Sequence, residues 1–300
     1  METKISTSVP CQREQFSAFI KALIAKYQPT QIYCFGRAMQ QDFKAGCFIT
    51  AAEQQHDQYY LLVVTAGSTR SEHDIQDFAT NHYPLGTVTI LAHTREAVAQ
   101  ALKTNNRFFT TVCSLGELLY THDGMVQVIP SVTKSIMNSA EQTEKSYLHR
   151  KELALGFLAS ARECQINELY PLAAFMLHQV VEQCCVALIG VHLGYRSDVH
   201  NLHRQLRLCS CFSTAPAAIF LSGAEEDQRL FERLVKSYTA ARYHEEFKVS
   251  KEDAQQLFIR VSTFLKLSEI MCQEKIKELT DLISDMEESK LPAFHPMATY

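Results

Sequence analysis

The chain changes character at Pro130, and no other feature of the sequence constrains its fold as strongly. Before this residue, runs rich in β-branched and aromatic residues alternate with segments of helical apolar periodicity. After it, strand-like runs disappear and long helical periods continue to about residue 275. The sequence therefore predicts an α/β domain over residues 1–130, a linker over 131–138, an all-α domain over 139–275 and a tail over 276–300.

The first domain is predicted to be a small mixed sheet with helices. Strands are expected at residues 32–35, 59–65 and 87–91, and helices at residues 11–27, 71–82 and 94–103. Thr94 is a good N-cap for the last of these helices, in which we expect Ala97 and Leu102 to face inward. Residues 118–120 and 125–129, which flank His122-Asp123-Gly124, are expected to pair as a hairpin.

The second domain is predicted to be an up-and-down bundle of five helices. The first helix is expected over residues 144–165. The second has Pro171 in its first turn and is apolar on nearly all sides, so it should lie at the centre of the bundle. A short third helix is expected around Leu202, Leu206 and Leu208, followed by a loop over residues 210–223 and a fourth helix over residues 230–238. Ser250, with Asp253 three residues later, is expected to cap the fifth helix. From Lys275 onward, the charged segment is expected to extend the fifth helix and then to be disordered.

Composition and charge limit the possible functions. The chain is 46% hydrophobic and 21% charged, which is typical of a soluble globular protein, and its net charge of −4 excludes capture of nucleic acid by bulk charge. Any nucleotide or RNA site must therefore be local, and we expect no sequence-specific binding of DNA. Polar residues such as His178 and Glu182 interrupt the longest apolar run, so no membrane contact is expected. Ten cysteines without a signal peptide favour a reducing compartment, the cytoplasm.

Two short strings in the first domain carry a resemblance. Ile32-Tyr33-Cys34-Phe35-Gly36-Arg37 follows a helix and Pro29, and Tyr59-Tyr60-Leu61-Leu62-Val63-Val64 comes some twenty residues later. Together they resemble the minimal nucleotidyltransferase fold, over about residues 12–122. That family has a Phe-Gly-Ser turn after its first strand and an Asp-x-Asp pair opening its second strand. Here Arg37 replaces the serine, and Gln58 and Tyr60 stand where the aspartates belong.

The missing aspartates decide what this domain can do. In the family, the glycine turn brings backbone N–H groups to the nucleotide phosphates, and the paired carboxylates hold a divalent metal ion. Asp57 is one residue out of register, and a slip of one residue in a strand turns a side chain to the opposite face. We therefore expect a degenerate domain with no metal site and no cofactor. Gly36 and Arg37 stay candidates for binding a nucleotide, the alternative being that Gly36 is only a turn.

In the second domain, several strings fit one family in order. They are residues 174–182 (AFMLHQVVE), 194–202 (GYRSDVHNL), 230–231 (LF), 238–243 (YTAARY) and 249–250 (VS). From Ser146 to Leu267 the chain resembles the HEPN family, whose members often occur beside a minimal nucleotidyltransferase. The resemblance implies a dimerising bundle that binds nucleotide or RNA and, in one branch of the family, cleaves RNA without metal.

The ribonuclease branch carries an arginine followed, after four to six residues, by a histidine near the last core helices. Arg242 has only Tyr243 between it and His244. Arg196 and His203 have six residues between them, but they lie at the entrance of the third helix. The ribonuclease motif is therefore not intact, and the sequence favours a protein without catalytic activity.

A polar stripe interrupts the apolar second helix, because His178 and Glu182 are one turn apart. Buried polar groups need hydrogen-bond partners, and these two residues could simply satisfy each other and neighbouring helix ends. Alternatively, they line a groove in which arginines meet phosphate and a tyrosine stacks on a base. The other residues of that predicted groove are Arg196, His200, His203, Arg242 and Tyr243.

His200, His203, Cys209 and Cys211 are ligand types found in tetrahedral zinc sites. A single residue between the two cysteines is unusual for such a site, and cysteines elsewhere in the chain fall on apparent helix or strand faces as small apolar residues. The sequence analysis therefore assigns no metal ligands.

These observations favour a non-catalytic, cytoplasmic protein that binds nucleotide or RNA, with a regulatory or toxin–antitoxin-like role and a homodimer formed through the bundle. A first alternative is a metal-independent endoribonuclease that uses Arg242 or Arg196 with His203 or His244. A second alternative is a pure interaction module, in which the polar stripe is structural.

Overall fold

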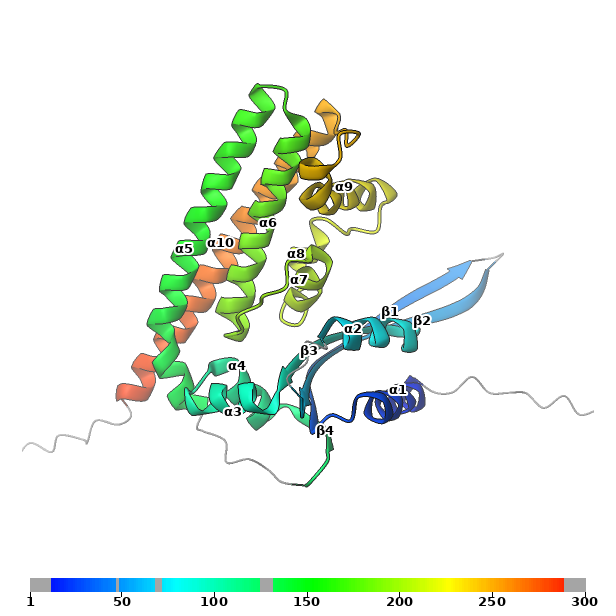
Figure 1. Cartoon of the computed structure of the whole chain (residues 1–300), viewed down its shortest axis with the longest axis vertical. Helices are drawn as coiled ribbons and strands as arrows, with labels where there is room; N and C mark the ends of the chain where they lie inside the picture. The colour runs from blue at the N-terminus through cyan, green and yellow to red at the C-terminus, as the bar shows by residue number, and fades with distance from the viewer. Residues whose placement is uncertain (1–11, 47–48, 68–71, 125–131, 289–300) are drawn as a thin grey trace, which may run out of the picture. The chain divides into compact units, whose positions relative to one another are not determined.

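The computed structural model describes residues 12–46, 49–67, 72–124 and 132–288, and the chain divides into two compact units. The first unit comprises Met1–Thr104 and Phe109–Pro130, and the second comprises Asn105–Phe108 and Ser131–Tyr300. Figure 1 shows the mixed sheet and the helical bundle that these units contain.

The first unit is built on a four-stranded mixed sheet with the order β3-β2-β1-β4. Its strands are β1 (Gln31–Gly46), β2 (Ile49–Thr65), β3 (Gly86–Thr94) and β4 (Glu117–Thr121). β1 pairs antiparallel with both β2 and β4, whereas β2 and β3 are parallel. The predicted combination of a mixed sheet and helices is confirmed.

Four helices accompany the sheet, α1 (Gln12–Tyr27), α2 (Glu72–His82), α3 (Arg95–Lys103) and α4 (Arg107–Leu115). Leu23 from α1 and Ile75 from α2 are fully buried together with Leu61 and Val63 from β2. The two β2 residues are two positions apart and therefore share one face of the sheet. This face, covered by α1 and α2, holds the core of the first unit.

Some details of the first unit differ from the expectations. β1 and β2 form a long hairpin ribbon, paired from Gln31 with Val64 to Gly46 with Ile49, where only short apolar strands were predicted. Residues 118–120 pair with β1, and residues 125–129, their expected hairpin partner, lie outside the described residues. In α3, Thr94 caps the helix as predicted and Leu102 is buried, but Ala97 is exposed and Val98 faces inward instead. The prediction for Ala97 was therefore wrong by one position on the helix.

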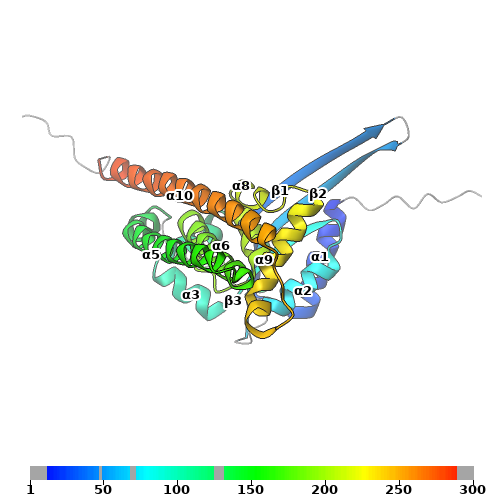
Figure 2. The same cartoon turned by 90° about the horizontal axis from the view of Figure 1, so that it is seen from above.

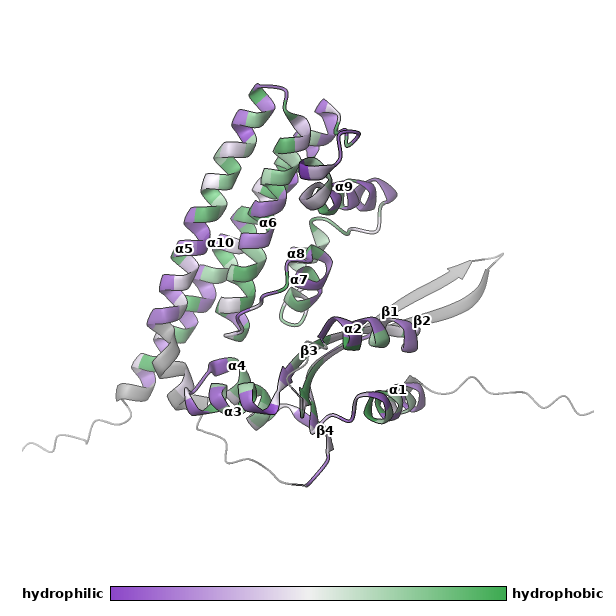
Figure 3. Ribbon diagram, viewed as in Figure 1, coloured by the Kyte–Doolittle hydropathy of each residue, from purple (hydrophilic) through white to green (hydrophobic). Residues whose placement is uncertain are grey.

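The second unit is the predicted helical bundle. Its helices are α5 (Val132–Ile166), α6 (Tyr170–Leu193), α7 (Leu202–Cys209), α8 (Ala215–Ala218), α9 (Glu225–Tyr243) and α10 (Lys251–Glu288). α6 packs against α5, α7, α9 and α10, and hydrophobic residues occupy much of its length in the ribbon of Figure 3. It begins with Pro171 in its first turn, and Ser250 Oγ accepts a hydrogen bond from the Asp253 N–H at 3.0 Å to cap α10.

The bundle helices extend beyond their predicted limits. α5 already begins at Val132, inside the range 131–138 that the sequence analysis assigns to a linker. As expected for the charged segment after Lys275, α10 continues to Glu288, whereas the one-turn helix α8 lies within the segment expected to be a loop. By length and composition α6 could cross a membrane, but most of it is buried inside the bundle, as in the core helix of a globular domain.

Candidate functional site

The polar stripe on α6 is buried and makes a first contact with α9. His178 is 2% exposed and Glu182 is 6% exposed. The Nδ1 atom of His178 lies 3.1 Å from the backbone oxygen of Leu234. A carbonyl oxygen can only accept, so Nδ1 carries the proton in this hydrogen bond. The other ring nitrogen of His178, Nε2, is therefore the one that faces Glu182.

The Nε2 atom of His178 lies 3.9 Å from Oε2 of Glu182, too far for a hydrogen bond. Neither atom has a hydrogen-bond partner among the residues that the structure describes. Burial lowers the pKa of His178 below its ordinary value of 6.5 and outweighs the hydrogen bond to Leu234 and the charge of Glu182, which raise this pKa. The nearby positive charge of Arg242 lowers it as well. Neutral His178 presents a lone pair to a carboxylate oxygen, so two buried acceptors face each other without a donor between them.

The second carboxylate oxygen of Glu182 is hydrogen-bonded. Oε1 accepts from Nδ1 of His200 at 2.9 Å, and the His200 side chain is 66% exposed. A buried carboxylate thus orients an exposed imidazole and fixes the proton on Nδ1. This leaves Nε2 of His200 available to solvent or to a ligand.

Arg242 lies in the last turn of α9 and packs against three aromatic rings. Its guanidinium carbon is 4.5 Å from the ring centre of Tyr238, 5.0 Å from that of Tyr243 and 5.4 Å from that of Phe175. Its Nε donates to the backbone oxygen of Tyr238 at 2.6 Å. Tyr238 in turn stacks on the ring of His178, with the ring centres 5.1 Å apart. We call the connected group of Phe175, His178, Glu182, His200, Tyr238, Arg242 and Tyr243 the His178 cluster.

Comparison with known families decides the nature of this unit, because residues 147–271 match the model of the HEPN domain. The C-terminal part of the chain carries a HEPN domain. All residues of the His178 cluster lie within the matched range, and the resemblance inferred from residues 146–267 is confirmed.

A match to one solved structure extends over most of the chain. It is the crystal structure of a nucleotidyltransferase-like protein from Exiguobacterium sibiricum 255-15, which shares 13% sequence identity with this chain. The similarity covers 94% of this chain and 81% of that chain, with a TM-score of 0.28. A search of curated protein sequences found no match.

The HEPN domain brings together five of the predicted site residues, namely His178, Glu182, His200, Arg242 and Tyr243. Two others have different neighbours. Arg196 lies on an exposed loop, 4.0 Å from Asp198, and His203 pairs with Glu232 of α9 at 3.0 Å. The printed contacts of Arg196 and His203 are thus with residues that do not belong to the His178 cluster.

His244 directly follows α9, where its backbone N–H bonds to the Ala240 oxygen. The sequence analysis missed two members of the cluster, Phe175 and Tyr238. The available signal was their helical spacing, since Phe175 is three residues before His178 and Tyr238 is four residues before Arg242.

The two histidines with zinc-ligand chemistry bind different carboxylates, and one of the two cysteines is buried. His200 binds Glu182, His203 binds Glu232 and Cys209 is fully buried. In the part of the chain that the structure describes, no three side chains of His, Cys, Asp or Glu lie close enough together to hold a metal ion.

In the first unit, the predicted turn at Gly36 is absent. β1 continues through Gly36, which pairs with Tyr60 next to a bulge, and the strand extends ten residues further to Gly46. Arg37 Nη2 lies 3.2 Å from Oδ2 of the buried Asp57, and the same oxygen accepts a hydrogen bond from the Tyr59 hydroxyl at 3.1 Å. The expectation of a phosphate-binding turn at Gly36 is corrected, since hairpin pairing keeps this backbone extended.

The two positions of the missing aspartates are occupied by a polar pair. Tyr60 donates its hydroxyl hydrogen to Oε1 of Gln58 at 3.0 Å, whereas Asp57 bonds to Tyr59 on the other face of β2. Asp57 thus points away from the positions that the paired carboxylates would need. Its charge is balanced by Arg37.

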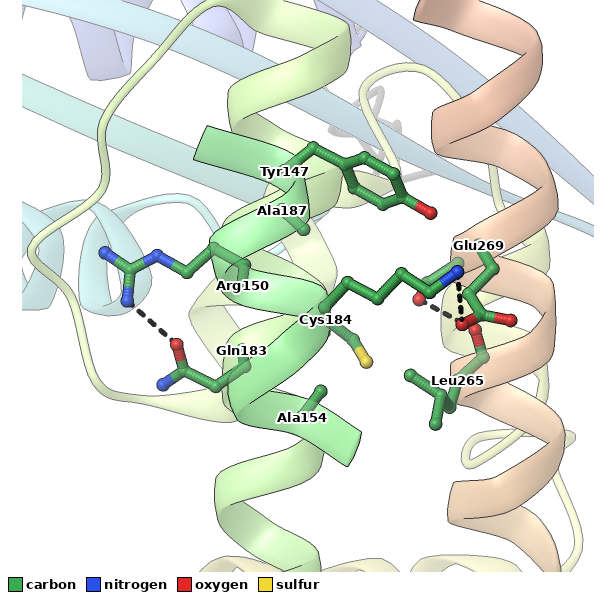
Figure 4. Close-up of a pocket in the computed structure, with 10 residues that line it drawn as sticks. Tyr147, Arg150, Ala154, Gln183, Cys184, Ala187, Leu265 and Glu269 are labelled. Carbon is green, nitrogen blue, oxygen red and sulfur yellow. Dashed lines mark hydrogen bonds and ion pairs between the residues drawn. The ribbon is translucent and has the colours of Figure 1, made fainter. Parts of the chain in front are cut away.

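The HEPN domain also has a small hollow among α5, α6 and α10, with a volume of about 190 Å³ that includes open solvent (Figure 4). Its charged side chains are already paired, whereas the buried hydroxyl of Tyr147 has no hydrogen-bond partner among the described residues. Arg150 donates to Oε1 of Gln183 at 2.8 Å, and Lys151 lies 3.2 Å from Glu269. The hollow therefore offers little unused hydrogen-bonding capacity to a charged ligand.

Proposed function

We propose that this protein binds a nucleotide or RNA at the His178 cluster of its HEPN domain, without catalysing metal-dependent phosphoryl transfer. One observation carries the proposal. Arg242 is held on aromatic rings beside a buried His178–Glu182 pair, in which two polar atoms lack hydrogen-bond partners among the residues described.

The chemistry of the cluster suits such a ligand. An arginine fixed by stacking presents its N–H donors to phosphate oxygens with little loss of side-chain freedom. The ring of Tyr243, whose residue is 72% exposed, lies beside Arg242 and offers a face on which a base can stack. His200, oriented by Glu182, adds a ring nitrogen that can donate to phosphate when protonated.

The absence of transfer activity follows from the donor set in the first unit. A divalent metal ion at a transferring phosphoryl group needs anionic oxygen ligands, and the family that β1 and β2 resemble supplies two of them on one strand face. Here Asp57 is engaged by Arg37 and Tyr59, and the opposite face carries Gln58 and Tyr60. A protein that binds its ligand without converting it to a product fits a regulatory role in the cytoplasm, such as that of a toxin–antitoxin-like component.

Direct titration tests the proposal. We expect the full chain to bind ATP, GTP or a short RNA at low salt, measured by calorimetry and by fluorescence anisotropy. Arg242→Ala should weaken binding by about tenfold or more, because a charge-assisted contact to phosphate is lost. Arg196→Ala is the matched control, since Arg196 is exposed outside the cluster, and it should leave the affinity within about twofold. Absence of binding for every nucleotide and RNA at low salt would refute the proposal.

The contact between Glu182 and His200 favours a second candidate function, cleavage of RNA. The 2.9 Å contact between Glu182 and His200 resembles the carboxylate–imidazole pair of a general acid–base group, and Arg242 supplies a cation nearby. The HEPN domain would then be a metal-independent ribonuclease in which His200 takes the place expected for His203 or His244. This candidate predicts RNA cleavage in EDTA that is lost in His200→Ala. RNA that stays intact after long incubation would exclude it.

A further inference from the structure

The outward side of α5 carries a regular stripe of exposed residues, Leu148, Glu152, Leu155, Ala159, Arg162 and Ile166. Successive members are alternately four and three residues apart, which is the spacing of a coiled-coil seam. The three large apolar members are well exposed, Leu148 at 54%, Leu155 at 45% and Ile166 at 66%. We call this stripe the outer face of α5.

The outer face has no partner within the bundle. α5 packs on α6 and α10 through its other side, where Tyr147, Ala154 and Ala161 are buried. Figures 1 and 2 both show α5 at the outside of the bundle, with α6 and α10 along one side of it. Scattered exposed leucines are ordinary, but a seam that keeps its period over 18 residues spans about 27 Å of helix and fits another helix.

The residues of this seam are complementary to themselves in one orientation. An antiparallel pair of α5 helices centred on Phe157 places Leu148 opposite Ile166 of the second copy, and Leu155 opposite Ala159. The same register places Glu152 opposite Arg162, twice, by symmetry. A parallel pair would instead place Glu152 opposite Glu152 and Arg162 opposite Arg162. Charge therefore selects the antiparallel arrangement.

The residue beside the centre of this register supports close approach of a second helix. Gly156 is exposed in the middle of a long helix, and a Cβ added to it would meet no other atom within 4 Å. A glycine here destabilises the helix relative to alanine, and no contact within the described chain accounts for it.

We propose that the outer face of α5 is a self-association surface, on which α5 of a second copy packs antiparallel with Glu152 paired to Arg162. Sequence analysis leads us to expect a homodimer formed through the bundle. The structure adds the face, the register and the charge pair that fix its symmetry. This proposal does not depend on the ligand proposed for the His178 cluster.

Charge reversal tests the register with the full chain. Wild-type protein should be a dimer in analytical ultracentrifugation. Glu152→Arg and Arg162→Glu should each raise the dimer dissociation constant by about tenfold or more, because two opposite-charge pairs become two like-charge pairs. An equimolar mixture of the two variants should recover association, since every pair in the mixed dimer is again of opposite charge. Glu274→Arg on α10 makes the same charge change on another exposed helix surface and should have no effect.

Three results would overturn the proposal. The first is a wild-type chain that stays monomeric at about 0.1 mM, a concentration at which even weak dimers form. The second is a dimer that neither charge reversal weakens, which would place the interface on another face. The third is a mixture of variants that fails to associate after each variant alone has lost association, which would exclude the antiparallel register. Circular dichroism of each variant confirms that the bundle is folded.

Discussion

In the HEPN domain, Nε2 of His178 lies 3.9 Å from Oε2 of Glu182, and the described part of the chain offers neither of these buried atoms a hydrogen-bond donor. This relationship predicts an unusual effect of a conservative change. Glu182→Gln keeps an oxygen for Nδ1 of His200 and turns an amide N–H group toward Nε2 of His178. We expect the free energy of unfolding to rise by about 1 kcal/mol, the usual net value of one added hydrogen bond. Urea denaturation measures it.

The control for this change is Glu182→Leu, which removes both oxygens and leaves Nδ1 of His200 and Nε2 of His178 without this neighbour. It should be less stable than Glu182→Gln. If Glu182→Gln instead lowers the free energy of unfolding, then a hydrogen-bond donor already lies between His178 and Glu182 in the native protein. In that case these two atoms are not a pair of unsatisfied acceptors.

Acid should destabilise the bundle through His192. Burial lowers the pKa of His192 to about 4, and the positive charges of Lys275 and Arg107 act in the same direction. The unfolded chain, with a pKa near 6.5, then binds the proton more tightly than the folded chain. The stability due to neutral His192 is complete above pH 6.5 and is lost progressively as the pH falls toward about 4. The loss is of the order of 2 kcal/mol.

Replacing His192 isolates this effect from the titration of carboxylates. The ring of His192 stacks on Phe212 with the ring centres 4.2 Å apart, so His192→Phe keeps an aromatic partner. We expect the free energy of unfolding of this variant to fall less steeply than that of wild type between pH 6.5 and about 4. Parallel curves for the two proteins over that range would show that His192 does not contribute.

The end of α6 should not tolerate a side chain at Gly194. This residue has φ +72°, and a Cβ added to it would lie 2.7 Å from Nε of Arg107. Arg107 donates to the backbone oxygens of Gly190 at 3.1 Å and Val191 at 2.5 Å, so displacing it exposes the last carbonyls of the helix. We expect Gly194→Ala to lower the free energy of unfolding by about 2 kcal/mol or more, from the left-handed backbone and the lost hydrogen bonds together.

Gly223→Ala separates the two contributions. Gly223 also has a positive φ, +95°, but a Cβ added there meets nothing within 4 Å. Its substitution should therefore cost only the backbone strain, about 1 kcal/mol. Equal losses for the two variants in thermal denaturation would mean that the contact with Arg107 is unimportant.

The sequence predicted correctly those helix ends that are set by a capping side chain a few residues away. Thr94 and Ser250 cap their helices as expected, because each needs only a side-chain oxygen and an N–H group three residues on. α4 was missed, since its residues 107–115 (RFFTTVCSL) are rich in aromatic and β-branched types that favour strands. The ribbon of β1 and β2 was also missed, because its outer residues lack apolar alternation and are paired with each other across the hairpin.

The candidate site was predictable only in part, because some of its contacts depend on how distant helices pack together. The spacing of His178 and Glu182 on an apolar helix is a local signal, and the structure places them together. His200 and His203 are three residues apart, yet His200 contacts α6 and His203 contacts α9. Which of the two joins Glu182 depends on how α7 packs against the bundle, and no pattern within the chain encodes that packing locally.

The ion pair in the first unit gives a last prediction, about the site that the sequence leads us to expect to be degenerate. The Asp57 side chain is fully buried, and Arg37 is its ion-pair partner. Arg37→Met should therefore remove this ion pair from a buried carboxylate and lower the free energy of unfolding by about 3 kcal/mol. The double variant Arg37→Met, Asp57→Asn should recover much of this loss, because the amide is neutral and its oxygen still accepts from Tyr59. Denaturation of the three proteins with and without Mg²⁺ and ATP measures the effect. If Mg²⁺ stabilised the wild type in a way that required Asp57, this carboxylate would be a metal ligand, and the first unit would not be degenerate.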